Sequence, residues 1–147
     1  MIKPIPGIKI YGDLSYRDKK CPRENLEQIT FISRVRKEYP DTHGLTLFHV
    51  KNEGKLINGQ FQEITKDKAM GMVTGCPDIH EHGNPSFCME LKRRDPTLSE
   101  ISEGQIKYLL AAQNNGSFVC VALGHEAAWE AFNEWREINE NRHKNTK

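Results

Sequence analysis

The sequence lacks several features that would indicate particular classes of protein. No apolar run approaches the roughly 20 residues of a membrane-spanning helix, and residues 1–7 show no apolar stretch or cleavage pattern of a signal peptide. The formal net charge is only +1, from 21 basic and 20 acidic residues, so any affinity for nucleic acid must come from local patches. No repeat or linker divides the 147 residues, and one domain is expected.

The four cysteines also lack the CxxC spacing of common metal and redox motifs. They lie mostly in apolar or strand-like stretches. A reduced protein in the cytoplasm is therefore the simpler interpretation. The four residues are Cys21, Cys76, Cys88 and Cys120.

The hydrophobic pattern predicts alternating helices and strands behind an N-terminal arm. We expect residues 1–20 to form an extended arm with a short edge strand at 8–11, residues 21–143 the main domain, and residues 144–147 a frayed tail. This order of helices and strands is typical of an α/β sheet with helices on its faces. Helices are predicted at 22–39, 62–72, 102–114 and 125–139, and strands at 45–50, 76–80, 87–92 and 118–122.

Residues 76–92 contain the most informative pattern in the chain. The turn-forming run at 82–85 predicts a hairpin that places Asp78 directly across from Glu90. Side chains alternate along a strand, so Lys92 shares their face. One register thus produces one buried apolar face and one face with two acids and a base. The apolar face would hold Ile79, Phe87, Met89 and Leu91.

Two carboxylates in close proximity repel each other unless a cation lies between them. Mg²⁺ or Mn²⁺ suits a site of carboxylates, a backbone carbonyl and water, and such an ion can activate water and stabilise charge on a phosphoryl oxygen. Lys92 could hold the attacking water and neutralise the phosphate. The pattern therefore suits metal-assisted hydrolysis of a phosphodiester bond.

Two other interpretations of these residues stay open. Asp78, Glu90 and Lys92 could be ordinary surface charges, although the following Arg93 and Arg94 suit a phosphate backbone and Gly71 and Gly75 suit a close backbone approach. A zinc site is the second alternative, but its spacing, Cys-x3-His-x-His-x5-Cys, is not common among structural zinc sites. Its ligands would be Cys76, His80, His82 and Cys88.

An ordered set of motifs from about residue 23 to residue 132 resembles the VRR-NUC branch of the PD-(D/E)XK nucleases. The set begins with a Glu early in the first helix and continues with the stretch at 48–55, which resembles the family's strand and Asn-x-Gly loop. It goes on with the stretch 71–78 ending in Asp78, with Glu90-Leu91-Lys92-Arg93, and with Gln105 at the start of a helix. A glycine followed by an apolar strand, residues 116–121, completes it.

This resemblance implies a restriction-endonuclease-like fold, a mixed sheet flanked by helices in the order αβαββαβα, and divalent-metal-dependent cleavage of DNA. Asp78 and Glu90 would be catalytic metal ligands, joined by Glu24 (preferred over Glu27) and the Leu91 carbonyl. Lys92 would be the catalytic lysine. Gln105 would lie near the metal or the water, although it could equally be the capping-box partner of Ser102. The residues predicted to contact DNA are Asn52, Lys55, Arg93 and Arg94.

The expected function is a Mg²⁺- or Mn²⁺-dependent DNA endonuclease that selects DNA structure, similar to a Holliday-junction resolvase. Small members of this family imply a homodimer and a phage or mobile-element source. A nucleic-acid-binding protein without turnover and a zinc-stabilised interaction module are the alternatives. Two departures from the family are the first twenty residues, which have no counterpart, and Arg34, which replaces an aromatic residue.

Overall fold

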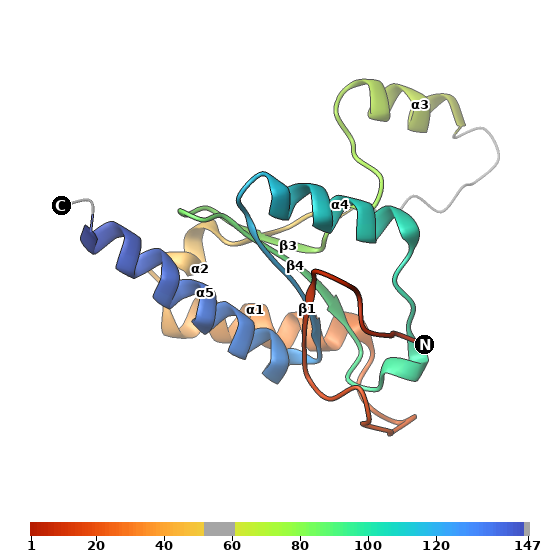
Figure 1. Cartoon of the computed structure of the whole chain (residues 1–147), viewed down its shortest axis with the longest axis horizontal. Coiled ribbons are helices and arrows are strands. Elements are labelled where there is room, and N and C mark those ends of the chain that lie inside the picture. Colours follow the sequence, from red (N-terminus) through yellow and green to blue (C-terminus); the bar gives the residue numbers. More distant parts are fainter. Residues whose placement is uncertain (52–60, 146–147) are drawn as a thin grey trace.

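The computed structural model describes residues 1–51 and 61–145, with only the backbone for 61–64. A five-stranded sheet lies between helices, and the helix at 61–69 stands apart from it (Figure 1). The elements in chain order are β1 (Lys9–Tyr11), α1 (Glu24–Glu38), α2 (His43–Thr46), β2 (Phe48–His49), α3 (Phe61–Ala69), β3 (Ile79–Glu81), β4 (Phe87–Lys92), the 3₁₀ turn η1 (Pro96–Leu98), α4 (Glu103–Asn114), β5 (Phe118–Leu123) and α5 (His125–Asn145).

The sheet is mixed, and its strand order is β1-β5-β4-β3-β2. Strand β5 pairs in parallel with β1 and β4, whereas β3 pairs antiparallel with β4 and β2. Helices α1 and α5 cover one face, and α4 covers the other (Figure 1). This arrangement confirms the predicted restriction-endonuclease-like α/β fold, with β1 and α2 added to the predicted order.

Each face of the sheet has its own core. The face under α1 and α5 is rich in aromatic side chains, among them the fully buried Phe31, Phe132 and Trp135. The face under α4 packs Val119 and Val121 of β5 against Leu109. Strand β5 is thus covered on both sides, as its uninterrupted apolar sequence predicts.

The predicted buried strand at 45–50 is wrong. Residues 43–46 form the short helix α2, and β2 is an exposed pair of residues at the edge of the sheet. Buried Glu81 holds the helical turn, because its Oε2 accepts from Thr46 Oγ1 and lies 2.8 Å from His43 Nδ1. The partners of Glu81 come from a distant part of the chain, so the local pattern does not reveal them.

Two helices also differ in detail from their predictions. Helix α5 continues to Asn145 instead of ending near 139, so the predicted tail is partly helical. Helix α1 has the predicted position but buries Glu27, Phe31 and Val35, while Ile29 is 60% exposed. A carboxylate occupies the buried stripe because it has a partner at the start of α5.

The predicted edge strand at 8–11 is present as β1 and makes the N-terminal arm part of the sheet. Its Tyr11 donates a hydrogen bond from its hydroxyl to Glu134 of α5, at 2.6 Å. Lys9 lies 3.2 Å from the same carboxylate. These contacts attach the arm to α5.

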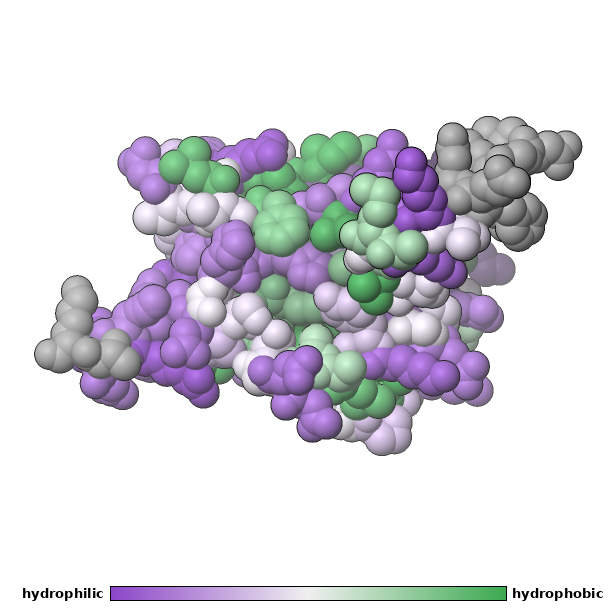
Figure 2. Space-filling view, turned by 90° about the horizontal axis from the view of Figure 1, so that it is seen from above, coloured by the Kyte–Doolittle hydropathy of each residue, from purple (hydrophilic) through white to green (hydrophobic). Residues whose placement is uncertain are grey.

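The surface seen in Figure 2 is mixed in character. Hydrophobic side chains lie there in separate groups among hydrophilic ones. Within residues 1–51 and 61–145, no helix combines the length and the apolar character needed to cross a membrane.

Candidate metal centre

Three carboxylates converge where α1, β3 and β4 meet. Glu24 is the first residue of α1, Asp78 directly precedes β3, and Glu90 lies in β4. One oxygen from each lies within 4.8 Å of the other two. Among the residues that the structure describes, this is the only group of three or more His, Cys, Asp or Glu side chains so arranged. Three of the four predicted metal ligands are therefore brought together.

The predicted hairpin register is confirmed and explains how two of these acids meet. Ile79 pairs with Met89 and His80 with Cys88, so the next pair along the ladder is Asp78 and Glu90. The backbone N–H of Leu91 donates to Asp78 Oδ2 at 3.3 Å. This contact places the main chain of Leu91 beside the cluster, as a carbonyl ligand would require.

Strand β2 holds the main chain of Asp78 in place. The Asp78 carbonyl accepts from the backbone N–H of Val50 at 2.9 Å and lies 2.9 Å from His49 Nδ1. A buried strand at 45–50, as the local pattern predicts, would not provide this support, which comes from the exposed edge strand β2 and Val50. The only available signal was the position of His49 within the motif at 48–55.

Glu90 and Lys92 are buried and Asp78 and Glu24 are half-buried, which corrects the picture of a solvated charged face. Glu90 is 1% exposed and Lys92 is 8% exposed, because α4 covers this side of the sheet. Burial, followed by the proximity of Asp78, raises the pKa of Glu90 from 4.5 to about 9, and the Lys92 ammonium opposes this rise. Ordinary surface charge does not describe this site.

The site has an unsatisfied oxygen. Glu90 Oε1 accepts from Gln105 Nε2 at 3.0 Å and lies 3.5 Å from Lys92 Nζ. Glu90 Oε2 is buried without a hydrogen-bond partner among the described residues. Burying an unpaired carboxylate oxygen is unfavourable, and an all-oxygen set of three acids suits a hard divalent cation. The residues present therefore fit Mg²⁺ or Mn²⁺.

Gln105 forms the predicted capping box and also contacts the acid cluster, while its predicted place beside the metal or the water stays a prediction. Its Oε1 accepts from the backbone N–H of Ser102 at 2.9 Å, and its own backbone N–H donates to Ser102 Oγ at 3.1 Å. This capping box begins α4. The remaining Nε2 donates to Glu90, so the start of α4 is tied to the acid cluster.

The two roles can be separated by Gln105→Glu. Glutamate also completes a capping box with serine, so α4 should still begin at the same residue. Gln105→Ala removes the capping box, and its free energy of unfolding should be about 1 kcal/mol lower than that of wild type. Glutamate loses the donor to Glu90 and adds a fourth acid to the cluster. We expect Gln105→Glu to destabilise the metal-free protein and to gain more thermal stability from Mg²⁺ than wild type. Thermal unfolding with EDTA and with Mg²⁺ measures both effects, and an unchanged Mg²⁺ response would contradict them.

The close backbone approach predicted near Asp78 is present at Gly75. It is absent at Gly71. Both glycines have positive φ, 78° at Gly75 and 113° at Gly71. A Cβ on Gly75 would lie 2.4 Å from the backbone of Gly104 and 2.7 Å from the nitrogen of Gln105, whereas a Cβ on Gly71 would have nothing within 4 Å. Only Gly75 is therefore needed to bring the Asp78 segment against α4.

Gly75→Ala and Gly71→Ala form a matched pair. Both should cost about 1–3 kcal/mol through backbone strain at positive φ. Gly75→Ala must additionally displace the start of α4, and we expect it to weaken Mg²⁺ binding as well. Urea unfolding and Mg²⁺ titration of both variants would show this, and equal Mg²⁺ affinities would refute the packing argument.

Of the four residues predicted to contact DNA, the structure describes two. Asn52 and Lys55 fall outside the described residues. Arg93 donates to the carbonyls of Cys21 and Pro22, at 2.6 and 3.2 Å. Arg94 is exposed and lies 4.2 Å from the ring centre of Tyr16. Arg94 thus contacts the N-terminal arm and Arg93 contacts the residues that directly follow it, and DNA contact by either stays a prediction.

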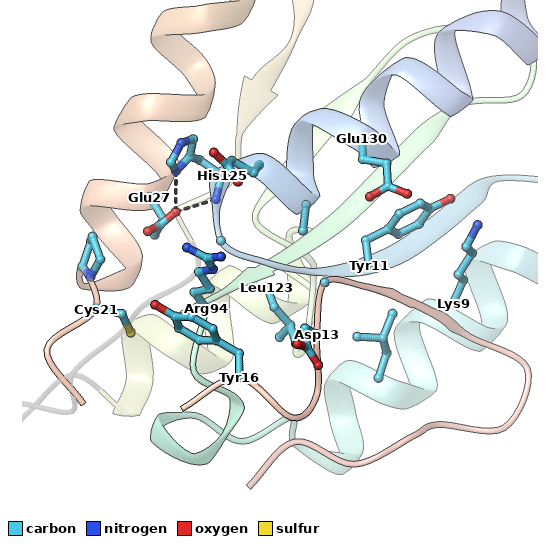
Figure 3. A pocket seen from close by; sticks show the side chains of 16 residues that line it. Lys9, Tyr11, Asp13, Tyr16, Cys21, Glu27, Arg94, Leu123, His125 and Glu130 are labelled. Carbon is cyan, nitrogen blue, oxygen red and sulfur yellow. Dashed lines mark hydrogen bonds and ion pairs between the residues drawn. The ribbon is translucent and has the colours of Figure 1, made fainter. Parts of the chain in front are cut away.

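Glu24 and Glu27, the two acids considered as a metal ligand in the first helix, lie in different environments. Glu27 Oε2 accepts a short hydrogen bond from the backbone N–H of His125 and lies 2.9 Å from His125 Nδ1. Figure 3 shows these two contacts beside a cavity of about 550 Å³ lined by β1, the first turns of α1 and the start of α5. Glu27 therefore faces this cavity and supports α5, while Glu24 faces the acid cluster.

The residues of the alternative zinc site do not gather as ligands in the described part of the chain. His80 Nε2 lies 3.4 Å from Cys76 Sγ and also 2.9 Å from the carbonyl of Pro77. Burial raises the pKa of the Cys88 thiol to about 12, which disfavours the thiolate that zinc requires. The His82 ring is tilted by 38° against the ring of Phe48, with the two ring centres 5.9 Å apart.

The fold and the acid cluster define a restriction-endonuclease-like α/β domain. A solved structure described as "VRR_NUC domain protein" shares this fold with a TM-score of 0.63, over 78% of this chain and 88% of that chain, at 18% identity. The resemblance predicted from the sequence is therefore confirmed at the level of the fold. No protein-family model matches the sequence, and a comparison with curated proteins finds no match.

Proposed function

We propose that this protein is a divalent-metal-dependent DNA endonuclease that hydrolyses phosphodiester bonds. The observation that carries the proposal is the convergence of Glu24, Asp78 and Glu90 beside a buried lysine. Glu90 and Lys92 are buried and Glu24 and Asp78 are half-buried, which is costly for charged side chains unless they bind something. The fold shared with a VRR_NUC domain protein supports the same activity.

Each residue has a distinct part in this proposal. Glu24, Asp78, Glu90 and the Leu91 carbonyl would hold Mg²⁺ or Mn²⁺. The ion supplies Lewis acidity toward the scissile phosphate. Lys92, directed at Glu90, neutralises charge that develops on the phosphate and orients the attacking water. Gln105 keeps Glu90 in position through its amide.

We further propose selectivity for DNA structure, as in a junction-resolving enzyme that acts as a homodimer. The support is the resemblance to small stand-alone family members, since two active sites suit paired cleavage of two strands. A phage or mobile-element source and a cytoplasmic location stay predictions from the sequence.

Cleavage of a panel of labelled DNAs tests the activity. The panel contains duplex, single strand, flap and four-way junction, each incubated with Mg²⁺, Mn²⁺ or EDTA. We expect cleavage that requires metal and is fastest on a branched substrate. Asp78→Ala, which removes one carboxylate of the cluster, should be inactive on every substrate.

Three outcomes would decide against the proposal. Cleavage in EDTA, or equal rates for wild type and Asp78→Ala, would place the activity elsewhere. Tight DNA binding without cleavage in either metal would favour the nucleic-acid-binding alternative. Stoichiometric zinc in protein purified without added metal would favour the zinc-stabilised module.

A further inference from the structure

A strongly basic segment leads directly into the metal centre. Residues 17–23 read Arg-Asp-Lys-Lys-Cys-Pro-Arg, and Glu24 follows at once. The side chains of Lys19, Lys20 and Arg23 are exposed. None of these three forms an ion pair with another residue in the described part of the chain. They are therefore available to an anionic partner.

The backbone of this segment is fixed by the chain that follows the catalytic lysine. Asp95, which is 1% exposed, accepts the backbone N–H of Asp18 at 2.8 Å. Arg93 donates to the carbonyls of Cys21 and Pro22. The Cys21 side chain is buried as well. Several contacts thus hold the main chain while the basic side chains extend outward.

The internal geometry of the segment reinforces this arrangement. Asp18 Oδ1 accepts the backbone N–H of Lys20 at 2.9 Å, and the Asp18 carbonyl accepts that of Cys21 at 3.0 Å. These bonds form a tight turn with Lys19 and Lys20 at its tip. Prearranged charges lose less entropy on binding than charges on a flexible tail.

The basic segment also lies close to the metal centre. Lys20 precedes Glu24 by four residues, so their Cα atoms are at most about 14 Å apart. Arg93 and Asp95, which brace the segment, follow Lys92 by one and three residues. The arm and η1 lie at the same end of the molecule as the start of α1 (Figure 1). A nucleic-acid strand in the metal centre would pass within reach of the three basic side chains.

We propose that residues 18–23 are the docking segment for the phosphodiester backbone of the substrate, with Lys19, Lys20 and Arg23 each at a phosphate. Arg93 and Asp95 act as positioning residues for this segment. The inference rests on the proposed function for the identity of the substrate, nucleic acid. It assigns a role to residues 18–20, the end of the arm that has no counterpart in the minimal family domain, together with the three residues that follow.

Salt dependence of DNA binding tests the inference. Anisotropy of a short labelled DNA duplex is measured in EDTA, where no metal-dependent cleavage occurs. The test variant is Lys19→Gln, Lys20→Gln, Arg23→Gln. Each phosphate contact contributes about 0.9 to the slope of log K against log salt, so the slope should fall by about 2–3 in magnitude and affinity should drop at least tenfold.

Two further variants provide the controls. Arg36→Gln, Lys37→Gln, Lys144→Gln removes the same charge from exposed positions, two of them at the far end of α1, about 20 Å along the helix; it should keep the wild-type slope. Lys19→Arg, Lys20→Arg, Arg23→Lys retains the charges and should also keep it. Thermal unfolding should show all three variants folded, with a small loss of stability in the Arg36, Lys37, Lys144 control because these residues lie in the last turns of α1 and α5.

The outcomes separate this inference from the proposed activity. A wild-type slope in the test variant, or an equal loss in the Arg36, Lys37, Lys144 control, overturns the docking segment even if wild type cleaves DNA. The expected slope change together with no cleavage in Mg²⁺ or Mn²⁺ supports the segment and overturns the endonuclease. Absence of DNA binding by wild type overturns the segment directly.

Discussion

Lys92→Met is expected to reduce Mg²⁺-dependent DNA cleavage about 10²–10³-fold without weakening Mg²⁺ binding. Loss of one group that stabilises transition-state charge typically has this effect. The lysine is buried beside Glu90, with its ammonium 3.5 Å from Oε1. Methionine has a similar length and suits a buried position. The fold should therefore persist while the charge is lost.

The response to Mg²⁺ distinguishes catalysis from metal binding in this variant. Without the lysine, three acids have no neighbouring ammonium, so metal-free Lys92→Met should be less stable than wild type and should gain more stability from Mg²⁺. Single-turnover cleavage and thermal unfolding measure the two properties. Lys107→Met, at an exposed position of α4, is the control and should resemble wild type. Loss of the Mg²⁺ response in Lys92→Met would mean that the lysine supports metal binding instead.

Glu90→Gln is expected to abolish both cleavage and the stabilisation by Mg²⁺, and to leave the metal-free protein at least as stable as wild type. The carboxylate is 1% exposed, and its Oε2 has no hydrogen-bond partner among the described residues. Near neutral pH the folded metal-free wild type must keep Glu90 protonated to avoid burying a charge beside Asp78 and Glu24, and a neutral amide of the same shape removes this cost. Most core substitutions destabilise, so an unchanged or higher stability would be a specific sign of a metal site.

The pH dependence of this stability difference has a definite sign. The pKa of folded Glu90 is about 9, against an ordinary value of 4.5. Between these values the unfolded state releases a proton that the folded state retains, so the stability of metal-free wild type should fall as the pH rises. Glu90→Gln should lack this component of the decline. Urea unfolding in EDTA across this interval measures it, and parallel curves for the two proteins would contradict the assignment.

Glu27→Gln is the matched control on the same helix. Glu27 accepts from His125 at the start of α5 and lies outside the acid cluster. Its replacement should lower stability in EDTA and with Mg²⁺ alike, and should preserve the stabilisation that Mg²⁺ provides. If Glu27→Gln were no longer stabilised by Mg²⁺, Glu27 instead of Glu24 would be the metal ligand from α1.

Local patterns in the sequence determined much of the site. Alternation along 76–92 was sufficient for the register that pairs Ile79 with Met89, because a slip by one residue would exchange the two faces of the strand. The Ser102–Gln105 capping box could also be predicted from the sequence, because its hydrogen bonds join neighbours in the chain. Both features depend on residues within one short stretch of the chain, ten positions apart for Ile79 and Met89 and three for Ser102 and Gln105.

Only the tertiary structure decided which groups are buried and which acid of α1 joins Asp78 and Glu90. The cover of α4 over Glu90 and Lys92, the separation of Glu24 from Glu27, and the binding of the arm by Arg93 and Asp95 all join segments distant in sequence. The same holds for Glu81, whose contacts replaced the predicted strand with α2. A local pattern specifies which face of an element is apolar, but the packing of distant elements decides whether its polar face meets water or protein.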